Sequence, residues 1–166
     1  DPNGINMGSK RITISTAGVI RKIEEFTKSK EKFKLAISLN GTTNEQRTSI
    51  MPINIKNSLE ELLNVSRKYT ETVNRWLTFE YVLLKEINDS IEDAKRLLSM
   101  LAGLKKCKLN IIPYNETDGK FRRPDRDQIE KFVVALRSAK FPITVRWSKG
   151  TDIDAGCGQL ATKNQI

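Results

Sequence analysis

The sequence predicts an α/β fold in which strands and helices alternate around one parallel sheet. Five short runs rich in β-branched and aromatic residues are separated by stretches with helical periodicity. Two of these runs, 33–39 and 107–114, are apolar along nearly their whole length, which is typical of strands covered on both faces. Such alternation implies right-handed crossovers between parallel strands.

The five expected strands are short and spread along most of the chain. In order they are "RITIST" (11–16), "FKLAISL" (33–39), "WLTFEYVLL" (76–84), "CKLNIIPY" (107–114) and "PITVRWS" (142–148). Five strands are too few for a closed eight-stranded barrel. The sheet is therefore either open and doubly wound or part of something larger, and the pattern alone does not separate the two.

Helices are expected between the strands, where capping residues precede apolar stripes. A short amphipathic helix is expected over 19–26. Ser58 opens a capping box with the glutamate three residues later. Ser90 or Asp89 caps the next helix, and Asp125 precedes a helix whose apolar residues follow i, i+3, i+4, i+7 spacing.

Length and composition indicate one globular domain over residues 1–166. Apolar residues make up 38% and charged residues 30%, and no apolar run approaches the roughly 20 residues of a membrane span. The start of the chain lacks the apolar core of a secretion signal, and two cysteines do not suggest a disulfide framework. We therefore expect a cytoplasmic protein without a membrane partner.

The charge balance favours a polyanionic partner. The chain carries 29 Lys and Arg against 20 Asp and Glu, a net charge of +9. Nucleic acid is the obvious candidate, although many basic proteins bind no anion specifically. The sequence holds no histidine, which excludes Ser–His and Cys–His catalysis and histidine zinc ligands within this chain.

Small polar residues stand at the ends of successive expected strands. Ser15 and Thr16 end the first strand, Ser38 and Asn40 end the second, and Asn115 follows the fourth. Ligands of parallel α/β folds bind beyond the carboxyl ends of the strands. Each residue alone is better explained as a turn or helix cap, but their recurrence favours a site for a polar small molecule.

Glu80 lies inside the third expected strand, where burying an unpaired carboxylate is costly. It is expected to face a polar lumen or a partner such as Arg75, and an ion pair and a ligand contact are equally open. The phosphate-loop patterns GxxxxGK and GxGxxG are absent from the sequence, which argues against a nucleotide hydrolase or a dinucleotide enzyme.

The stretch "KFRRPDR" (120–126) places four basic side chains around Phe121. Arginine can pair with phosphate and phenylalanine can stack on a base, so the stretch is a candidate RNA contact. A solvated basic loop ahead of a helix explains the same residues and is preferred from this stretch alone.

The two cysteines have different surroundings. Cys107 opens an apolar strand and is expected to be a small core or edge residue. Cys157 lies between Gly156 and Gly158 in "DIDAGCGQL", where the nearby aspartates would raise the pKa of a thiol. It is therefore not expected to be a protease-like thiolate nucleophile, and composition leaves its role open.

Several motifs of this sequence occur together, in the same order, in one protein family. They are "RITISTAGVI", "LAISLNGTTNEQR", "IMPIN", "LTFEYVLLKEINDS", "KLNIIPYN", "RRP" and "DIDAGCGQLA". From about Gly4 to Ala161 the chain resembles the C-terminal portion of the radical-SAM RNA methyltransferases of the RlmN/Cfr type. The resemblance implies the C-terminal portion of a partial (β/α) barrel of parallel strands, with S-adenosylmethionine bound at the strand ends.

The resemblance also implies roles for individual residues. Cys157 matches the cysteine that carries the methyl group, which is then converted to a methylene radical that adds to adenine. Adenine C2 is a poor nucleophile, so polar methyl transfer fails there and a radical route is needed. The residues that match S-adenosylmethionine contacts are Ser15, Ser38, Leu39, Asn40 and Asn115.

Some features of the family are absent from this sequence. The CxxxCxxC motif of the [4Fe-4S] cluster, the resolving cysteine and the N-terminal accessory domain are missing, so no metal ligand is assigned here. We expect a truncated chain whose missing N-terminal half is a partner. Asn40 stands where the family usually has histidine, and Gly41–Thr42 where it has Ala-Pro.

The implied function is methylation of C2 of an adenine in 23S ribosomal RNA, and of an adenine beside the anticodon of transfer RNA. The implied cofactors are a [4Fe-4S] cluster in the complete enzyme and two molecules of S-adenosylmethionine. Adenine-C8 methylation is a competing hypothesis, although "DIDAGCGQL" is more like the C2 enzymes. Two hypotheses without methylation stay open as well: a non-catalytic basic RNA-binding module, and an independent open α/β domain that binds a small nucleotide.

The chain by itself is expected to show no turnover, because reductive cleavage of S-adenosylmethionine requires the cluster. Purified chain incubated with a reductant and S-adenosylmethionine should yield no 5′-deoxyadenosine above a protein-free control, as measured by liquid chromatography. Formation of 5′-deoxyadenosine would show this expectation to be wrong.

Overall fold

The computed structural model describes residues 12–29, 31–116 and 119–147. The predicted strands and helices are confirmed there, and a short helix, α2, with a 3₁₀ turn, η2, is added to them. The elements are β1 (Thr13–Thr16), α1 (Ile20–Ser29), β2 (Lys34–Ser38), α2 (Asn44–Ile50), η2 (Pro52–Ile55), α3 (Leu59–Thr72), β3 (Leu77–Leu83), α4 (Ile91–Leu101), β4 (Cys107–Pro113), α5 (Arg126–Ala135) and β5 (Ile143–Val145).

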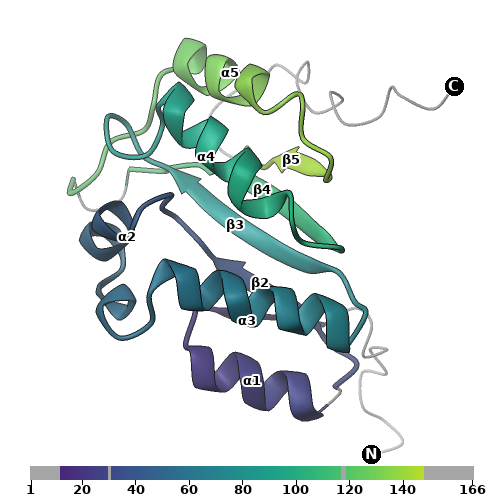
Figure 1. Cartoon of the computed structure of the whole chain (residues 1–166). Coiled ribbons are helices and arrows are strands. Elements are labelled where there is room, and N and C mark those ends of the chain that lie inside the picture. The colour runs from purple at the N-terminus through teal and green to yellow at the C-terminus, as the bar shows by residue number, and fades with distance from the viewer. Residues whose placement is uncertain (1–11, 30, 117–118, 148–166) are drawn as a thin grey trace, which may run out of the picture.

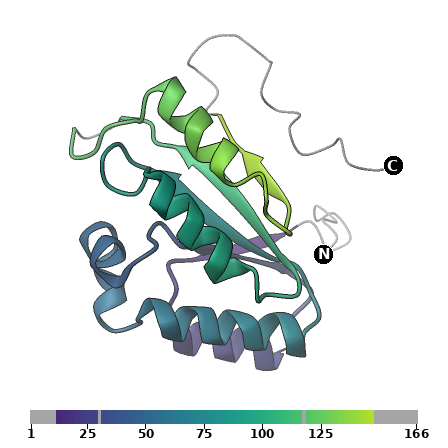
Figure 2. The same cartoon turned by 45° about the horizontal axis from the view of Figure 1, so that its top comes forward.

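All five strands are parallel and lie in chain order, β1-β2-β3-β4-β5. Right-handed crossovers between consecutive neighbours place every connecting helix on the same face of the sheet. Figure 1 shows α1, α3, α4 and α5 as one such layer, and in Figure 2 α4 and α5 lie in front of the strands. A doubly wound sheet reverses its strand order and carries helices on both faces, so the structure decides for a partial barrel.

The core lies between the sheet and this helix layer. In β3 and β4 every second residue is buried, and these side chains pack against helix residues such as Leu62, Leu97 and Phe132. The prediction that 107–114 is covered on both faces is wrong within the described residues, because Lys108 is exposed on the helix-free face. No helix in the described ranges is long and apolar enough to cross a bilayer.

Capping hydrogen bonds start three helices where the sequence predicts them. The Ser58 side chain accepts a hydrogen bond from the backbone of the third helical residue of α3, and that residue's carboxylate accepts one from Ser58 in return. Ser90, rather than Asp89, forms the same capping box for α4. Asp125 caps α5. These caps fix the starts of the three helices that cover the centre of the sheet.

Two fully buried tyrosines differ in whether their hydroxyl groups are paired. The Tyr81 hydroxyl donates a hydrogen bond to the carbonyl oxygen of Asn88 at 2.8 Å. The Tyr69 hydroxyl has no hydrogen-bond partner in the described part of the chain. Burial raises the pKa of both hydroxyl groups, so both stay protonated.

Tyr69→Phe is expected to raise the free energy of unfolding by about 1 kcal/mol, because it removes a buried hydroxyl that makes no hydrogen bond. Tyr81→Phe, the matched control, should lower it by about 1–3 kcal/mol because the Asn88 carbonyl loses its donor. Urea unfolding of both variants and the reference chain at neutral pH measures the difference. Equal effects of the two substitutions would contradict this explanation.

Candidate functional site

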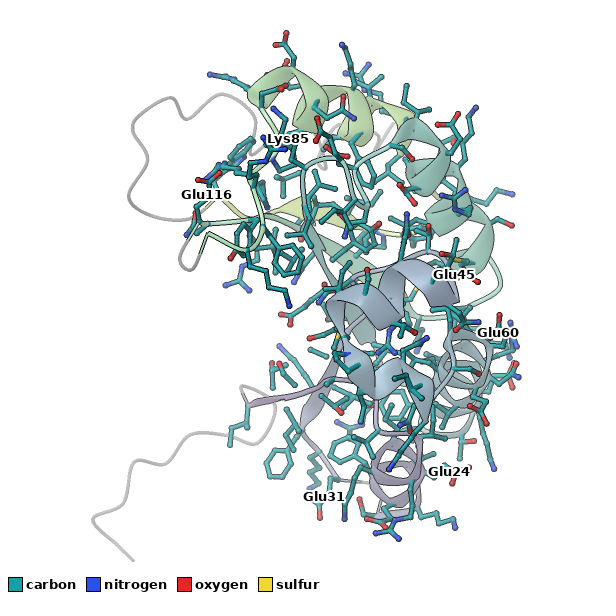
Figure 3. All side chains as sticks on the ribbon, turned by 90° about the vertical axis from the view of Figure 1, so that its left-hand side faces the viewer. Glu24, Glu31, Glu45, Glu60, Lys85 and Glu116 are labelled. Atoms are coloured by element: carbon teal, nitrogen blue, oxygen red, sulfur yellow. The ribbon has the colours of Figure 1, made fainter. Side chains whose placement is uncertain are left out.

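The candidate site lies at the carboxyl edge of the sheet, where all five parallel strands end. Figure 3 faces this edge, with α2 toward the viewer. Of the predicted residues, the structure brings Ser15 of β1, Ser38 of β2 and Asn115, two residues beyond β4, to this edge. Ser15 and Asn115 are exposed and Ser38 is half-buried.

A polar row crosses the helix-free face of the sheet near this edge. Ser38 lies opposite Glu80 in the strand register, Glu80 opposite Asn110, and Asn110 opposite Thr144. Laterally paired residues of a parallel sheet point to the same face, so the four side chains share one face. The Thr144 hydroxyl donates a hydrogen bond to the Asn110 side-chain oxygen. Hydroxyl, carboxylate and amide groups therefore line the open face below the strand ends.

Glu80 belongs to this row and forms no ion pair with any described residue. Arg75, named from the sequence as a possible partner, instead donates from Nη1 to the backbone carbonyl of Lys32 at 2.9 Å. The pairing of Glu80 with Arg75 is therefore wrong. The half-buried carboxylate faces the helix-free side of the sheet, in agreement with the other expectation, a polar lumen.

Ser38 and Leu39 offer very different groups to a ligand. The Leu39 side chain is fully buried, its backbone N–H donates to the Glu80 carbonyl at 2.8 Å, and its carbonyl accepts from Arg47 Nε at 3.0 Å. The Ser38 hydroxyl makes no hydrogen bond within the described ranges. Ser38 therefore presents a free side-chain donor and acceptor at this edge, whereas Leu39 shapes the edge through its backbone.

Asn40 uses its side chain to extend the pairing of β2 with β3. It adopts a left-handed conformation with φ 55, and its Oδ1 accepts a hydrogen bond from the backbone of Val82 at 2.9 Å. Its carbonyl accepts from the Nδ2 of Asn88, which is fully buried and also caps the Leu84 backbone N–H. The remaining polar group of the side chain is Nδ2, which donates to Met51 Sδ at 3.4 Å. Its second N–H is left for another partner.

Arg47 lies at the candidate site and is missed by the sequence analysis. Its side chain is completely buried, yet it contacts no carboxylate of the described residues, and burial lowers the pKa of its guanidinium. Nε donates to the carbonyl of Leu39, Nη1 to Asn54 Oδ1 at 2.9 Å, and Nη2 to the carbonyls of Ala17 at 2.6 Å and Ser38 at 3.4 Å. Arg47 ends the motif "LAISLNGTTNEQR", but the local pattern of residues does not distinguish a buried arginine there from a solvated one.

Asp93 ties the segment after β2 to the start of α4. Its side chain is 2% exposed and accepts hydrogen bonds from Thr42, Gln46, Ser90 and Arg96 at 2.5–2.8 Å. Burial alone would raise the pKa of this carboxyl, but the four hydrogen bonds together hold the pKa below its usual value. Asp93 is therefore ionised at neutral pH and fixes the loop that carries Asn40.

The basic stretch 120–126 adjoins Asn115 at this edge. Arg123 donates from Nη1 to Asn115 Oδ1 at 3.3 Å, and its guanidinium lies 5.6 Å from the ring centroid of Trp147. Phe121 packs edge-on against Tyr114 with the ring centroids 6.0 Å apart. The Asn115 oxygen is thus already engaged, whereas its amide N–H groups make no hydrogen bond with any described residue.

Backbone contacts hold the same stretch against the loop after β3. Lys85 donates its backbone N–H to the carbonyl of Arg122, whose guanidinium is 3.1 Å from Glu86. The backbone of Arg123 donates to Glu116 at 3.1 Å. Figure 3 shows Lys85 and Glu116 on neighbouring segments at this corner. The stretch is therefore bound to the edge of the sheet rather than standing apart from it.

The cysteines do not form an iron–sulfur site. Cys107 is buried at the start of β4, and burial raises the pKa of its thiol to about 11, which confirms it as a core residue. Cys157 lies outside the described residues. A CxxxCxxC cluster needs three thiolates and the sequence has two cysteines, so the chain's residues do not fit this cofactor. The described ranges likewise contain no group of three or more candidate metal ligands.

Curated relatives match this chain along nearly its whole length. It is 42% identical over 161 residues to the "Probable dual-specificity RNA methyltransferase RlmN" of Pseudothermotoga lettingae, covering 97% of this chain and 47% of that protein. The "Dual-specificity RNA methyltransferase RlmN" of Geotalea uraniireducens is 41% identical, with 96% and 46% covered. The chain thus spans about half the length of the curated relatives it matches. No protein-family model matches it.

Solved structures agree with the sequence relatives. A radical SAM methyltransferase from Sphaerobacter thermophilus superposes with a TM-score of 0.84 at 39% identity, over 96% of this chain and 47% of that one. A domain of a pyruvate-formate lyase-activating enzyme from Bacteroides vulgatus superposes with a TM-score of 0.63 at 16% identity, over 81% of this chain and 80% of that one, which is a likeness of fold alone. The resemblance inferred from the motifs is confirmed, as is the partial barrel.

Acidification is expected to destabilise the chain through Asp93. Because its pKa is lower in the folded state, the stability it contributes is present above the unfolded pKa, about 3.9, and is lost as the pH falls through the folded pKa. Asp93→Asn should lower the free energy of unfolding at neutral pH and reduce its loss on acidification. Urea unfolding at pH 7 and pH 3 tests this, with Glu71→Gln as control, because Glu71 is exposed and forms no ion pair with any described residue. An unchanged acid response in Asp93→Asn would contradict the assignment.

Proposed function

This chain is homologous to about half of an RlmN-type radical-SAM methyltransferase, and from that premise we propose that it works as part of an RNA methyltransferase. The observation that carries the proposal is the agreement of sequence and fold along nearly the whole chain, at 42% identity and a TM-score of 0.84. The free polar groups at the carboxyl edge of the sheet support a ligand site in the place where such folds bind ligands.

We assign S-adenosylmethionine to this edge. Its ribose hydroxyls and adenine nitrogens suit the Ser38 hydroxyl and the amide N–H groups of Asn115, and the Ser15 hydroxyl belongs to the adjacent strand end. Leu39 and Asn40 would contribute through the backbone and the edge that they shape. When bound, S-adenosylmethionine supplies the methyl group and the source of the radical.

We assign Cys157 as the residue that carries the methyl group. Cys107 cannot compete for this role, because its thiol is buried under the helix layer with its pKa raised to about 11. Gly156 and Gly158 flank Cys157 and give its backbone the freedom to approach both a cofactor and a base. The [4Fe-4S] cluster of the complete enzyme would be held by residues that are not in this sequence.

The proposed substrate is C2 of an adenine in 23S ribosomal RNA, with a transfer-RNA adenine as a second substrate. The relatives' names describe dual-specificity RNA methyltransferases, which supports RNA as the substrate class. The net charge of +9 and the arginines at the site edge also favour an RNA partner. Methylation of adenine C8 is the competing reaction. We also propose that the protein is located in the cytoplasm.

A chimaera tests the activity. This chain would replace the matching residues of the Geotalea uraniireducens relative, and the product would be incubated with a 23S RNA fragment, S-adenosylmethionine and a reductant. We expect 2-methyladenosine in nuclease digests analysed by mass spectrometry, and a signal below detection for Cys157→Ala. Cys107→Ala is the matched control and should keep the activity.

Different results of the same assay separate the competing functions. RNA binding by the chimaera without methylation in any variant would favour the non-catalytic RNA-binding module. The 8-methyl product would show the C8 activity instead. Methylation that survives Cys157→Ala would overturn the role assigned to this cysteine.

A further inference from the structure

The ends of β1 and β2 and the turn η2 converge on one buried side chain, Arg47. Its guanidinium reaches the carbonyl two residues after Ser15, the carbonyls of Ser38 and Leu39, and the side-chain oxygen of Asn54 in η2. A planar fork of five N–H donors can serve acceptors in several directions at once, which an ammonium or an apolar side chain cannot do. Three separate segments are therefore held by one group.

Two glycines make room for this side chain. A Cβ atom at Gly18, which has a φ of +98, would lie 2.7 Å from Arg47 Nη2, and one at Gly41 would lie 2.8 Å from Arg47 Cβ. Neither distance is tolerated between such atoms, so a side chain at position 18 would displace the guanidinium, and one at position 41 would displace the backbone of α2 that carries Arg47. Both glycines stand directly beside the segments that carry the proposed cofactor contacts.

The arrangement is costly for stability alone. A buried guanidinium loses its hydration, and among the described residues it finds neutral oxygen atoms rather than a carboxylate to offset that loss. Apolar side chains of similar volume often fill such positions at no loss of stability. The presence of a buried arginine at position 47 is therefore better explained by the positions in which it holds these carbonyls than by a gain in folding free energy.

We propose that Arg47 is a positioning residue that holds Ser15 and Ser38 at the relative placement needed to bind S-adenosylmethionine. The inference rests on the proposed cofactor site. Arg47 is fully buried behind the strand ends, so it acts through the backbone of the two serine-bearing strands. Holding both strand ends in place before the ligand arrives removes an ordering cost from binding.

Titration with S-adenosylmethionine of the chimaera with the Geotalea uraniireducens relative, which supplies the remaining half of the enzyme, tests this, with calorimetry for the affinity and a thermal scan for the fold. Arg47→Met should weaken the affinity by about tenfold or more. That factor corresponds to the net free energy of one to two of the hydrogen bonds that hold the strand ends in place. Arg47→Lys keeps the charge and should recover part of the affinity. Leu101→Ala is the control, because it destabilises the core at the opposite edge of the sheet without touching the site.

The outcomes distinguish this inference from the proposed function. Weaker binding by Arg47→Met, with unchanged affinity in a Leu101→Ala variant of equal or lower melting temperature, supports positioning. Equal affinity in the reference chimaera and its Arg47→Met variant overturns the inference and leaves the cofactor site intact. If the reference chimaera itself does not bind S-adenosylmethionine, both the cofactor site and the inference are wrong. Should Arg47→Met fail to fold, Arg47→Lys decides, since unchanged affinity there also overturns the inference.

Discussion

Parallel pairing of five strands in chain order is the constraint on which the rest of this structure depends. It places α1, α3, α4 and α5 on one face of the sheet. The other face carries side chains such as those of Ser38, Glu80 and Asn110. Parallel pairing also brings every strand to its end at the same edge, so that residues far apart in sequence meet there. A partial barrel with one helix-covered face and one helix-free face follows from this strand order.

Buried polar groups link the segments that meet at this edge. Arg47 donates to carbonyls just beyond the ends of β1 and β2. Asn88 donates to the segment after β2, and Asp93 of α4 accepts a hydrogen bond from the same segment. A buried polar group without a partner is costly, so each of the three accepts few different arrangements. Such an edge can keep a ligand site in shape while leaving the Ser38 hydroxyl unused.

The two cysteines illustrate how surroundings divide one residue type into two roles. Cys107 is covered by the helix layer, and its thiol stays protonated because burial disfavours the thiolate. Cys157, between two glycines, belongs to a segment whose sequence has no apolar stripe of its own. The proposed chemistry therefore rests on Cys157 and not on the buried Cys107, together with an edge whose free groups are hydroxyls and amides.

The sequence by itself determined the strands, three helix caps, the core position of Cys107 and the family resemblance, because these depend on local periodicity and on motifs of adjacent residues. It also placed Ser15, Ser38 and Asn115 at strand ends. The family motifs implied a partial barrel, whereas the periodicity of strands and helices left a doubly wound sheet open, and only the tertiary structure gave the strand order that separates the two. It likewise showed that Leu39 and Asn40 form hydrogen bonds with α2 and β3 and that Arg47 is buried, because those hydrogen bonds join segments that are separate in the chain.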